Sequence, residues 1–170
     1  MINFENAKSL LNECLVGKSI ISGKQFLDMT EFIFGVSKTT KDNGLDKNGK
    51  KVLDQYVLHI QTDFDIKKND ELLIERTERI TYYEYDPFYK NITAEINEFI
   101  DSEKKYMARI IDIFDSDDSF PIIKFNDGLV ISIKKLESGK ELWRVFRQTI
   151  KNEYYEEPHI VCYGNSISLE

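Results

Sequence analysis

The residue types best suited to chemistry recur in one segment near the middle of the chain. In residues 56–66 (YVLHIQTDFDI), His59, Gln61, Asp63 and Asp65 occupy every second position, so a β-strand would place them on one polar face. A histidine with two carboxylates can bind a metal ion or transfer protons. Alternate residues of a strand are about 6.6 Å apart, however, which puts His59 about 13 Å from Asp63. The spacing therefore predicts a solvated sheet face, and a hydrolytic or metal centre there requires the strand to bend after Gln61.

Other familiar chemical motifs are incomplete. Asp112, Asp115, Asp117 and Asp118 form an acidic cluster, but it lacks the glycine and the closing glutamate of a calcium-binding EF-hand loop. Neither glycine-rich phosphate-binding motif occurs in the chain. We therefore predict no metal and no cofactor. The sequence favours a non-catalytic protein, and an enzyme that uses His59 with Asp63 or Asp65 is kept as an alternative.

Two segments combine tyrosine with carboxylates. Residues 82–89 (YYEYDPFY) hold five aromatic side chains around two acids, and residues 154–157 (YYEE) repeat this composition. Tyrosine offers a large contact area with a polar tip, so such a surface suits a protein partner; the alternative is that the rings cap the core. The predicted partner-binding residues are Tyr82, Tyr83, Glu84, Tyr85, Asp86, Tyr89, Tyr154, Tyr155, Glu156 and Glu157.

A second functional prediction is a small-molecule site on the His59 face. A curved antiparallel sheet capped by two helices can enclose a ligand, and the residues assigned to such a pocket are His59, Gln61, Asp63 and Trp143. By itself, Trp143 is more typical of a core position. Glu141 and Arg144 fall on opposite faces of the predicted strand, so no direct pairing is expected, and His159 stands alone in the sequence.

Charge and composition narrow the class of partner. The chain has 170 residues, 41% of them hydrophobic, and a formal net charge of −7, which disfavours direct contact with nucleic acid and attracts a basic protein. No signal peptide or transmembrane segment is recognised. Cys14 and Cys162 form no C-x-x-C unit and are expected to be free thiols in the cytoplasm, with a disulfide between them left open.

The hydrophobic periodicity predicts an α+β fold, with about ten short, mainly antiparallel strands and two helices in a single domain, residues 1–170. A loose similarity of residues 16–34 to residues 107–125 raises an internal duplication, with halves 1–90 and 91–170, as an alternative organisation. A lysine-rich loop is expected at 37–51 and a hairpin at 120–134 through Asn126, Asp127 and Gly128. The expected helices are 4–15 and 92–104, and the expected strands are 18–23, 26–36, 56–66, 71–75, 77–83, 106–114, 120–125, 129–134, 141–147, 159–163 and 166–169.

Four short motifs resemble those of a family of small uncharacterised bacterial proteins. They are LVGK at 15–18, LHIQ at 58–61, FNDG at 125–128 and E-x-W-R-x-F at 141–146. Some members of that family are found beside toxins, so the resemblance implies an immunity role. Together with the charge and the tyrosine-rich acidic segments, this predicts a protein that inhibits a basic partner by covering it. The family has a Trp-Arg pair after LHIQ where this chain has Phe64 and Asp65, and it implies no catalytic residues.

Overall fold

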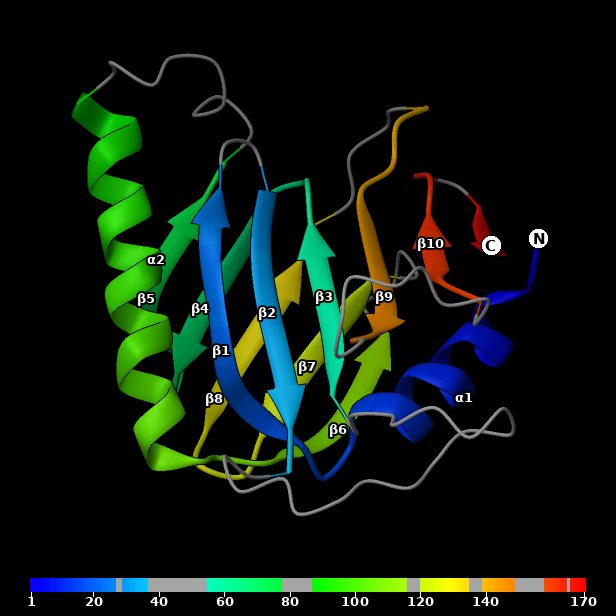
Figure 1. Cartoon of the computed structure of the whole chain (residues 1–170), viewed down its shortest axis with the longest axis horizontal. Coiled ribbons are helices and arrows are strands. Elements are labelled where there is room, and N and C mark those ends of the chain that lie inside the picture. The colour runs from blue at the N-terminus through cyan, green and yellow to red at the C-terminus, as the bar shows by residue number, and fades with distance from the viewer. Residues whose placement is uncertain are drawn as a thin grey trace.

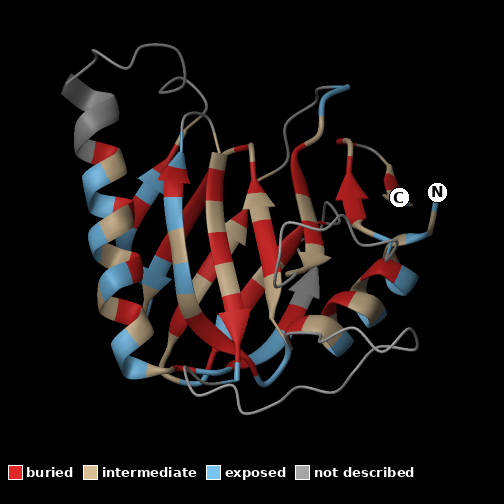
Figure 2. Ribbon diagram, viewed as in Figure 1, coloured by how far each residue is buried: buried red, intermediate tan, exposed pale blue. Residues whose placement is uncertain are grey.

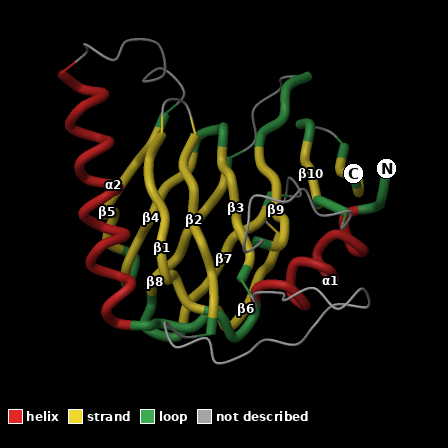
Figure 3. The backbone as a smooth tube through the Cα atoms, in the orientation of Figure 1, coloured by secondary structure: helices red, strands yellow, loops and turns green. Residues whose placement is uncertain are grey.

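The structure is a computed structural model that describes residues 1–26, 29–36, 55–77, 87–115, 120–134, 139–148, 158–164 and 166–170. Within these ranges, two helices and eleven strands form an α+β fold in which both sheets are antiparallel, as predicted (Figures 1 and 3). The six-stranded sheet has the order β1 (Ser19–Phe26), β2 (Met29–Gly35), β3 (Tyr56–Ile60), β9 (Trp143–Arg147), β10 (Ile160–Cys162) and β11 (Ile167–Leu169). The five-stranded sheet has the order β5 (Glu71–Arg76), β4 (Phe64–Lys68), β8 (Leu129–Ile133), β7 (Pro121–Phe125) and β6 (Ile110–Asp115).

The two sheets face each other and enclose one core. Strands of both sheets alternate between buried and more exposed residues (Figure 2), because successive side chains of a strand point to opposite faces. Aromatic rings join the sheets across the core: Phe32 lies 6.2 Å from Phe64, and Phe34 lies 6.5 Å from Phe125, between ring centroids. The inner faces of the sheets therefore form the core.

The helices close the two sides of this sandwich. Helix α1 (Phe4–Leu15) packs against β6, and α2 (Pro87–Tyr106) packs against β1 and β5 (Figure 1). The side chain of Asn3 caps α1 by accepting a hydrogen bond from the Asn6 amide at 2.8 Å, as its residue type predicted. Helix α2 begins at Pro87, earlier than the predicted residue 92. Pro87 fits this position, because proline is favoured at the first position of a helix.

The segment 56–66 is two strands, one in each sheet, and not the single strand that its alternation predicted. β3 ends at Ile60 and β4 begins at Phe64. At the crossing, the Gln61 amide donates to the Leu142 carbonyl and the hydroxyl of Thr62, which is fully buried, donates to the Lys134 carbonyl. Thr62 thus keeps the inward alternation unbroken while the chain changes sheets, so the pattern alone does not reveal the crossing.

Other predicted elements differ from the structure in their bounds or lie outside the described residues. The strand predicted at 26–36 is divided, because Phe26 ends β1 and Met29 begins β2, and β6 and β9 are shorter than predicted. The hairpin at 120–134 is confirmed, with Gly128 at a positive φ of 85° in its turn. The loop expected at 37–51 and residues 78–83 of the strand expected at 77–83 lie outside the described residues.

The order of the strands relates the two halves of the chain to each other. In each half a helix is followed by a three-stranded meander in one sheet, and then by two strands in the other sheet. The order β1-β2-β3-β9-β10 becomes β6-β7-β8-β4-β5 when the halves are exchanged, and α2 on β1 then corresponds to α1 on β6. β11 is an additional strand at the edge of the six-stranded sheet.

Local features repeat in the same places. A bulge follows Ile20 in β1 and Ile110 in β6, and the residues opposite them are Phe34 and Phe125, whose rings meet in the core. This topology is what a duplicated helix-and-strands unit would produce, and the duplication itself stays a prediction. Phe34 and Phe125 occupy corresponding positions in the two halves, and their rings meet between the two sheets.

Candidate functional site

The candidate site lies on the outer face of the six-stranded sheet. In the strand register His59 on β3 lies opposite Glu31 on β2 and opposite Arg144 on β9. Side chains directly opposite one another in a sheet share a face. Three strands that are far apart in the sequence therefore bring a carboxylate, an imidazole and a guanidinium into one row.

Short polar contacts fix these side chains in position. The Nε2 atom of His59 lies 3.1 Å from Oε2 of Glu31, and Nε of Arg144 donates to Oε1 of Glu141 at 2.6 Å. A second nitrogen of the same guanidinium, Nη2, contacts Oε2 of Glu141, and Nε2 of Gln61 donates to Oε1 of Glu141 at 3.1 Å. The four charged or imidazole side chains are only 15–27% exposed, so their mutual interactions are screened less than those of a free surface pair.

These contacts shift the acid–base equilibria of the site. The hydrogen bond from His59 holds the pKa of Glu31 below its ordinary value, against the opposing effect of burial. The hydrogen bonds to Glu141 raise the pKa of the Arg144 guanidinium. Both residues are thus held in their charged forms at neutral pH.

The second histidine of the chain belongs to the same face. His159 stacks on the Phe146 ring at 4.7 Å, and His59 meets that ring edge-on at 4.9 Å. The Nδ1 atom of His159 also lies 3.2 Å from Nη1 of Arg144. We call the seven residues Glu31, His59, Gln61, Glu141, Arg144, Phe146 and His159 the outer-face cluster. It holds both histidines of the chain.

Sequence reasoning missed parts of this cluster for identifiable reasons. Glu31 and His159 are assigned to no site by the sequence, because Glu31 reaches His59 only through the register of β2 and β3 and His159 only through the Phe146 ring that both histidines contact. The expectation that Glu141 and Arg144 would not pair is wrong: Glu141 precedes the start of β9 at Trp143, so it does not follow the alternation of the strand. The spacing of three residues between an acid and an arginine at a strand end was the available signal.

His159 is expected to make the stability of the protein fall in mildly acidic solution. Burial, and then the neighbouring Arg144 charge, lower the pKa of His159 below 6.5. The unfolded chain then binds more protons than the folded chain as the pH falls below about 6.5, so the free energy of unfolding decreases until the folded-state pKa is passed. Urea unfolding between pH 7.5 and 5.5 should show this decrease in the wild type and a smaller one in His159→Asn. Parallel profiles for the two proteins would contradict the assignment.

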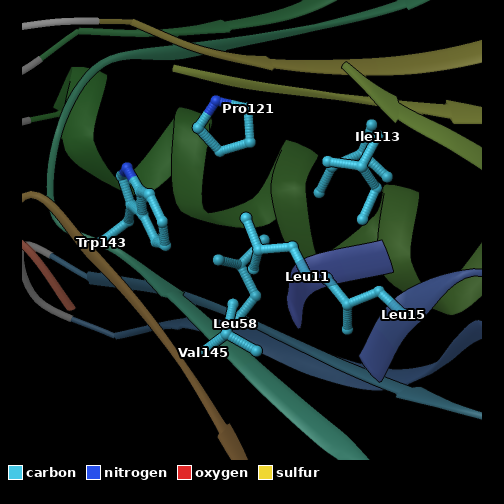
Figure 4. A pocket seen from close by; sticks show the side chains of 8 residues that line it. Leu11, Leu15, Leu58, Ile113, Pro121, Trp143 and Val145 are labelled. Carbon is cyan, nitrogen blue, oxygen red and sulfur yellow. The ribbon is translucent and has the colours of Figure 1, made fainter. Parts of the chain in front are cut away.

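The four residues of the predicted small-molecule pocket do not meet at one place. His59 and Gln61 lie on the outer face, whereas Trp143 is fully buried on the inner face of β9. Asp63 lies in the crossing between the sheets, where its carbonyl accepts a hydrogen bond from the Lys134 amide. Trp143 instead faces an apolar gap between the sheets, with Leu11, Leu15, Leu58, Ile113, Pro121, Ile123 and Val145 around it (Figure 4). The gap has no room for a water molecule, so it belongs to the core.

The remaining candidate residues are placed as follows. Asp65 lies on β4 in the five-stranded sheet, away from His59, and its Oδ2 atom is 3.2 Å from Nζ of Lys134. Among the described residues, no group of three or more His, Cys, Asp or Glu side chains is arranged to hold a metal ion. Cys14 and Cys162 are free thiols.

The predicted partner-binding residues fall outside what the structure describes. Tyr82, Tyr83, Glu84, Tyr85 and Asp86 precede α2, and Tyr154, Tyr155, Glu156 and Glu157 precede Pro158. Tyr89 is in α2, but its side chain is also outside the described part. Their role in binding stays a prediction.

None of the helices in the described part of the chain is long and apolar enough to cross a membrane.

Comparisons with known proteins add no assignment. No family model, curated protein or solved structure matches the chain.

Proposed function

We propose that this protein is a non-catalytic interaction module of the immunity or inhibitor kind, which binds a basic protein through acidic, tyrosine-rich surface. The observation that carries the proposal is the outer-face cluster, because its side chains are partly buried and already held in place by one another. Arginine and aromatic residues are over-represented among the residues that dominate protein–protein binding energy. Fixing their rotamers before association lowers the entropy that binding costs.

The chain connects this cluster to one of the two tyrosine-rich acidic segments. Residues 149–157 join β9, which carries Arg144 and Phe146, to Pro158 and His159. Glu157 is thus two residues from a member of the cluster. We infer that Tyr154, Tyr155, Glu156 and Glu157 extend the cluster into a larger binding surface, with the residues of 82–89 supplying a second group of anchors.

Charge supports a basic partner. The net charge of −7 would attract a basic protein and raise its association rate. Near the cluster, Glu170 adds a carboxylate that accepts a hydrogen bond from the Tyr163 hydroxyl at 2.7 Å. We propose that the protein acts in the cytoplasm and inhibits by covering the surface of its partner. The resemblance to toxin-associated bacterial proteins supports the immunity role.

The proposal is tested by capture from the native host followed by measurement of affinity with the purified partner. We expect one basic protein to be retained at about 0.05 M salt and largely released at about 0.5 M, because the attraction between exposed charges is screened over a few ångströms at high salt. The test variant combines Glu84→Gln, Asp86→Asn, Glu156→Gln and Glu157→Gln. It should bind the purified partner at least about tenfold more weakly than the wild type.

A matched variant separates the acidic segments from the overall charge. Glu71→Gln, Glu95→Gln, Glu98→Gln and Asp112→Asn also remove four negative charges, at exposed positions on β5, α2 and β6. This control should keep its affinity within about threefold, since exposed charges remote from an interface change binding little. An equal loss of affinity in both variants would show that net charge alone, and not the acidic segments, determines the binding. Retention of no partner at low salt would contradict the proposed function.

A further inference from the structure

His159 lies between two charged side chains of opposite sign on the outer face of the six-stranded sheet. Its Nδ1 atom is 3.2 Å from Nη1 of Arg144, which is within hydrogen-bond distance. A guanidinium has N–H donors and no acceptor, so this contact requires a lone pair on Nδ1. In this position the imidazole is therefore neutral, with its proton on Nε2.

Arg144 cannot turn away from the imidazole without losing other bonds. Nε of its guanidinium donates to Oε1 of Glu141 at 2.6 Å, and Nη2 contacts Oε2 of the same carboxylate. Such a paired contact fixes the plane of the guanidinium. If Nδ1 of His159 gained a proton, two cationic donors would face each other. The imidazole, which is held here by the Nδ1 contact and by stacking on Phe146, is then the group that must move.

Glu170 offers a protonated imidazole a partner on the opposite side, toward β11. The amide of His159 donates to the Glu170 carbonyl at 2.6 Å, and the amide of Glu170 donates to the His159 carbonyl at 3.0 Å. Two residues paired in this way lie opposite each other with their side chains on one face of the sheet, about 5 Å apart at Cβ. The hydroxyls of Tyr163 and Ser168 hold the Glu170 carboxylate by donating to its Oε1 atom at 2.7 and 3.1 Å. Its Oε2 atom takes part in neither bond.

We propose that His159 is a pH-operated switch between these two partners. When neutral, the imidazole accepts a hydrogen bond from Arg144 and covers the Phe146 ring, on which it stacks at 4.7 Å. When protonated, it turns about its own side-chain bonds, donates to the Glu170 carboxylate and uncovers the Phe146 ring. The backbone need not move, because the amide bonds between His159 and Glu170 hold it in both positions.

The surrounding charges place this change in mildly acidic solution. The charged and titratable groups that face His159 are Arg144 of β9, Glu141 before β9, His59 of β3 and Glu170 after β11. Burial, and then the Arg144 charge, lower the pKa of the imidazole below 6.5, and the two carboxylates oppose them. The hydrogen bond from Tyr163 holds the pKa of Glu170 below its ordinary value. The Glu170 carboxylate is therefore still charged when His159 gains its proton.

The other histidine of the outer-face cluster responds differently to a proton. Nε2 of His59 lies 3.1 Å from Oε2 of Glu31, and a protonated imidazole donates to a carboxylate as a neutral one does. Gain of a proton therefore keeps His59 in place. The loss of a contact with Phe146 is specific to His159.

The consequence for binding rests on the proposed function. Protonation of His159 adds a positive charge to the surface that we propose meets a basic protein, and it separates the stacked rings that would form part of that surface. Like charges across an interface disfavour binding. Mild acid should therefore weaken the complex.

The switch is tested by NMR on the isotopically labelled full chain, without a partner. At about pH 7.5 the imidazole of His159 should carry its proton on Nε2 and show nuclear Overhauser effects to the Phe146 ring. At about pH 5 both nitrogens should be protonated, the effects to Phe146 should be lost and new ones to the Glu170 side chain should appear. A proton on Nδ1 in neutral solution, or unchanged contacts with Phe146 in acid, would overturn the proposal.

Variants of the two partners should move the midpoint of the His159 titration in opposite directions. Glu170→Gln removes the acceptor of the protonated form, so the midpoint should fall. Arg144→Gln removes the cation that opposes protonation, so the midpoint should rise. Glu98→Gln is the matched control, at an exposed position of α2, and should leave it unchanged. If Arg144→Gln does not fold, the exposed Glu170→Gln decides alone, and a midpoint that it does not lower would count against the switch.

A binding measurement tests the regulatory role separately. With the basic partner obtained by capture, the loss of affinity from about pH 7.5 to about pH 5 should be at least about threefold larger for the wild type than for His159→Asn. Equal losses for the two proteins would overturn the regulation and leave the proposed function intact. Failure to find a partner would contradict the proposed function, whereas the NMR titration would still decide whether the switch exists.

Discussion

Replacing Trp143 by alanine is expected to lower the free energy of unfolding by about 3–5 kcal/mol, the range for removing a large aromatic side chain from a core. The indole is fully buried and lies between the sheets, close to Leu11 of α1, Leu58 of β3 and Pro121 of β7 (Figure 4). Because these neighbours belong to three elements that are fixed by their own pairings, they cannot collapse fully into the space left. The loss should lower the melting temperature by about 10 °C in a domain of this size.

The substitution Trp143→Phe should cost much less, below about 1.5 kcal/mol. The Nε1 atom of Trp143 is buried and has no hydrogen-bond partner among the described residues, and a buried unsatisfied donor destabilises the folded state. Phenylalanine removes that donor, which offsets part of the lost packing. The alanine and phenylalanine variants therefore separate the contribution of volume from that of the polar atom.

Urea unfolding followed by far-ultraviolet circular dichroism measures both changes, since Trp143 is the only tryptophan and its fluorescence is lost in the variants. Leu72→Ala is the control, because Leu72 is 51% exposed on β5. It should change stability by less than about 1 kcal/mol. A Trp143→Ala variant as stable as this control would show that the indole is not a core residue and would restore it as a ligand-binding platform.

The parts of the fold that depend on local chemistry could be predicted from the sequence. Asn3 marks the start of α1, and the Asn126-Asp127-Gly128 turn marks the hairpin of β7 and β8. A capping side chain and a residue at positive φ act within a few residues of their own position. The class of the fold follows from the same signals, because helical and strand periodicities are segregated along the chain.

The division into two sheets could not be predicted in this way. Ile60, Thr62 and Phe64 are all fully buried, so an alternating pattern runs through the point where the chain leaves one sheet and enters the other. What separates β3 from β4 is their partners: β3 pairs with β2 and β9, and β4 pairs with β5 and β8. Pairing between distant segments is not encoded in the alternation of either one.

The candidate site shows the same limit. Gln61 and Glu141, whose side chains form a hydrogen bond, are 80 residues apart, and the His59 contact with Glu31 spans 28. Polar alternation places His59 on the face of the sheet away from the core, where its side chain is 19% exposed. It could not select Glu31 and Arg144 as the neighbours of His59, because a shift of the register by one residue would turn each of them to the opposite face.

Glycine at position 23 is expected to be essential for the pairing of β1 with β2, and Gly23→Ala should lower the free energy of unfolding by about 3 kcal/mol. Gly23 lies opposite Phe32 in the register. A Cβ atom at this position would stand 2.2 Å from the carbonyl oxygen of Glu31 and 3.2 Å from Cδ1 of Ile100 in α2. The first contact is with backbone, which cannot rotate away as a side chain can, so the two strands must separate or α2 must shift.

The same substitution should disturb the candidate site, because the displaced carbonyl belongs to Glu31. If β2 moves, the contact between Glu31 and His59 lengthens and the pKa of Glu31 should rise toward its ordinary value. Titration of the glutamate carboxyl groups by NMR would detect this, and urea unfolding would give the loss of stability.

Gly139→Ala is the matched control, since no atom lies within 4 Å of a Cβ built at Gly139. Its stability should stay within about 0.5 kcal/mol of the wild type and its Glu31 titration should be unchanged. A Gly23→Ala protein with wild-type stability would mean that β1 and β2 are not packed as closely as this register requires. The row formed by Glu31, His59 and Arg144 would then lose the strand pairing on which it is built.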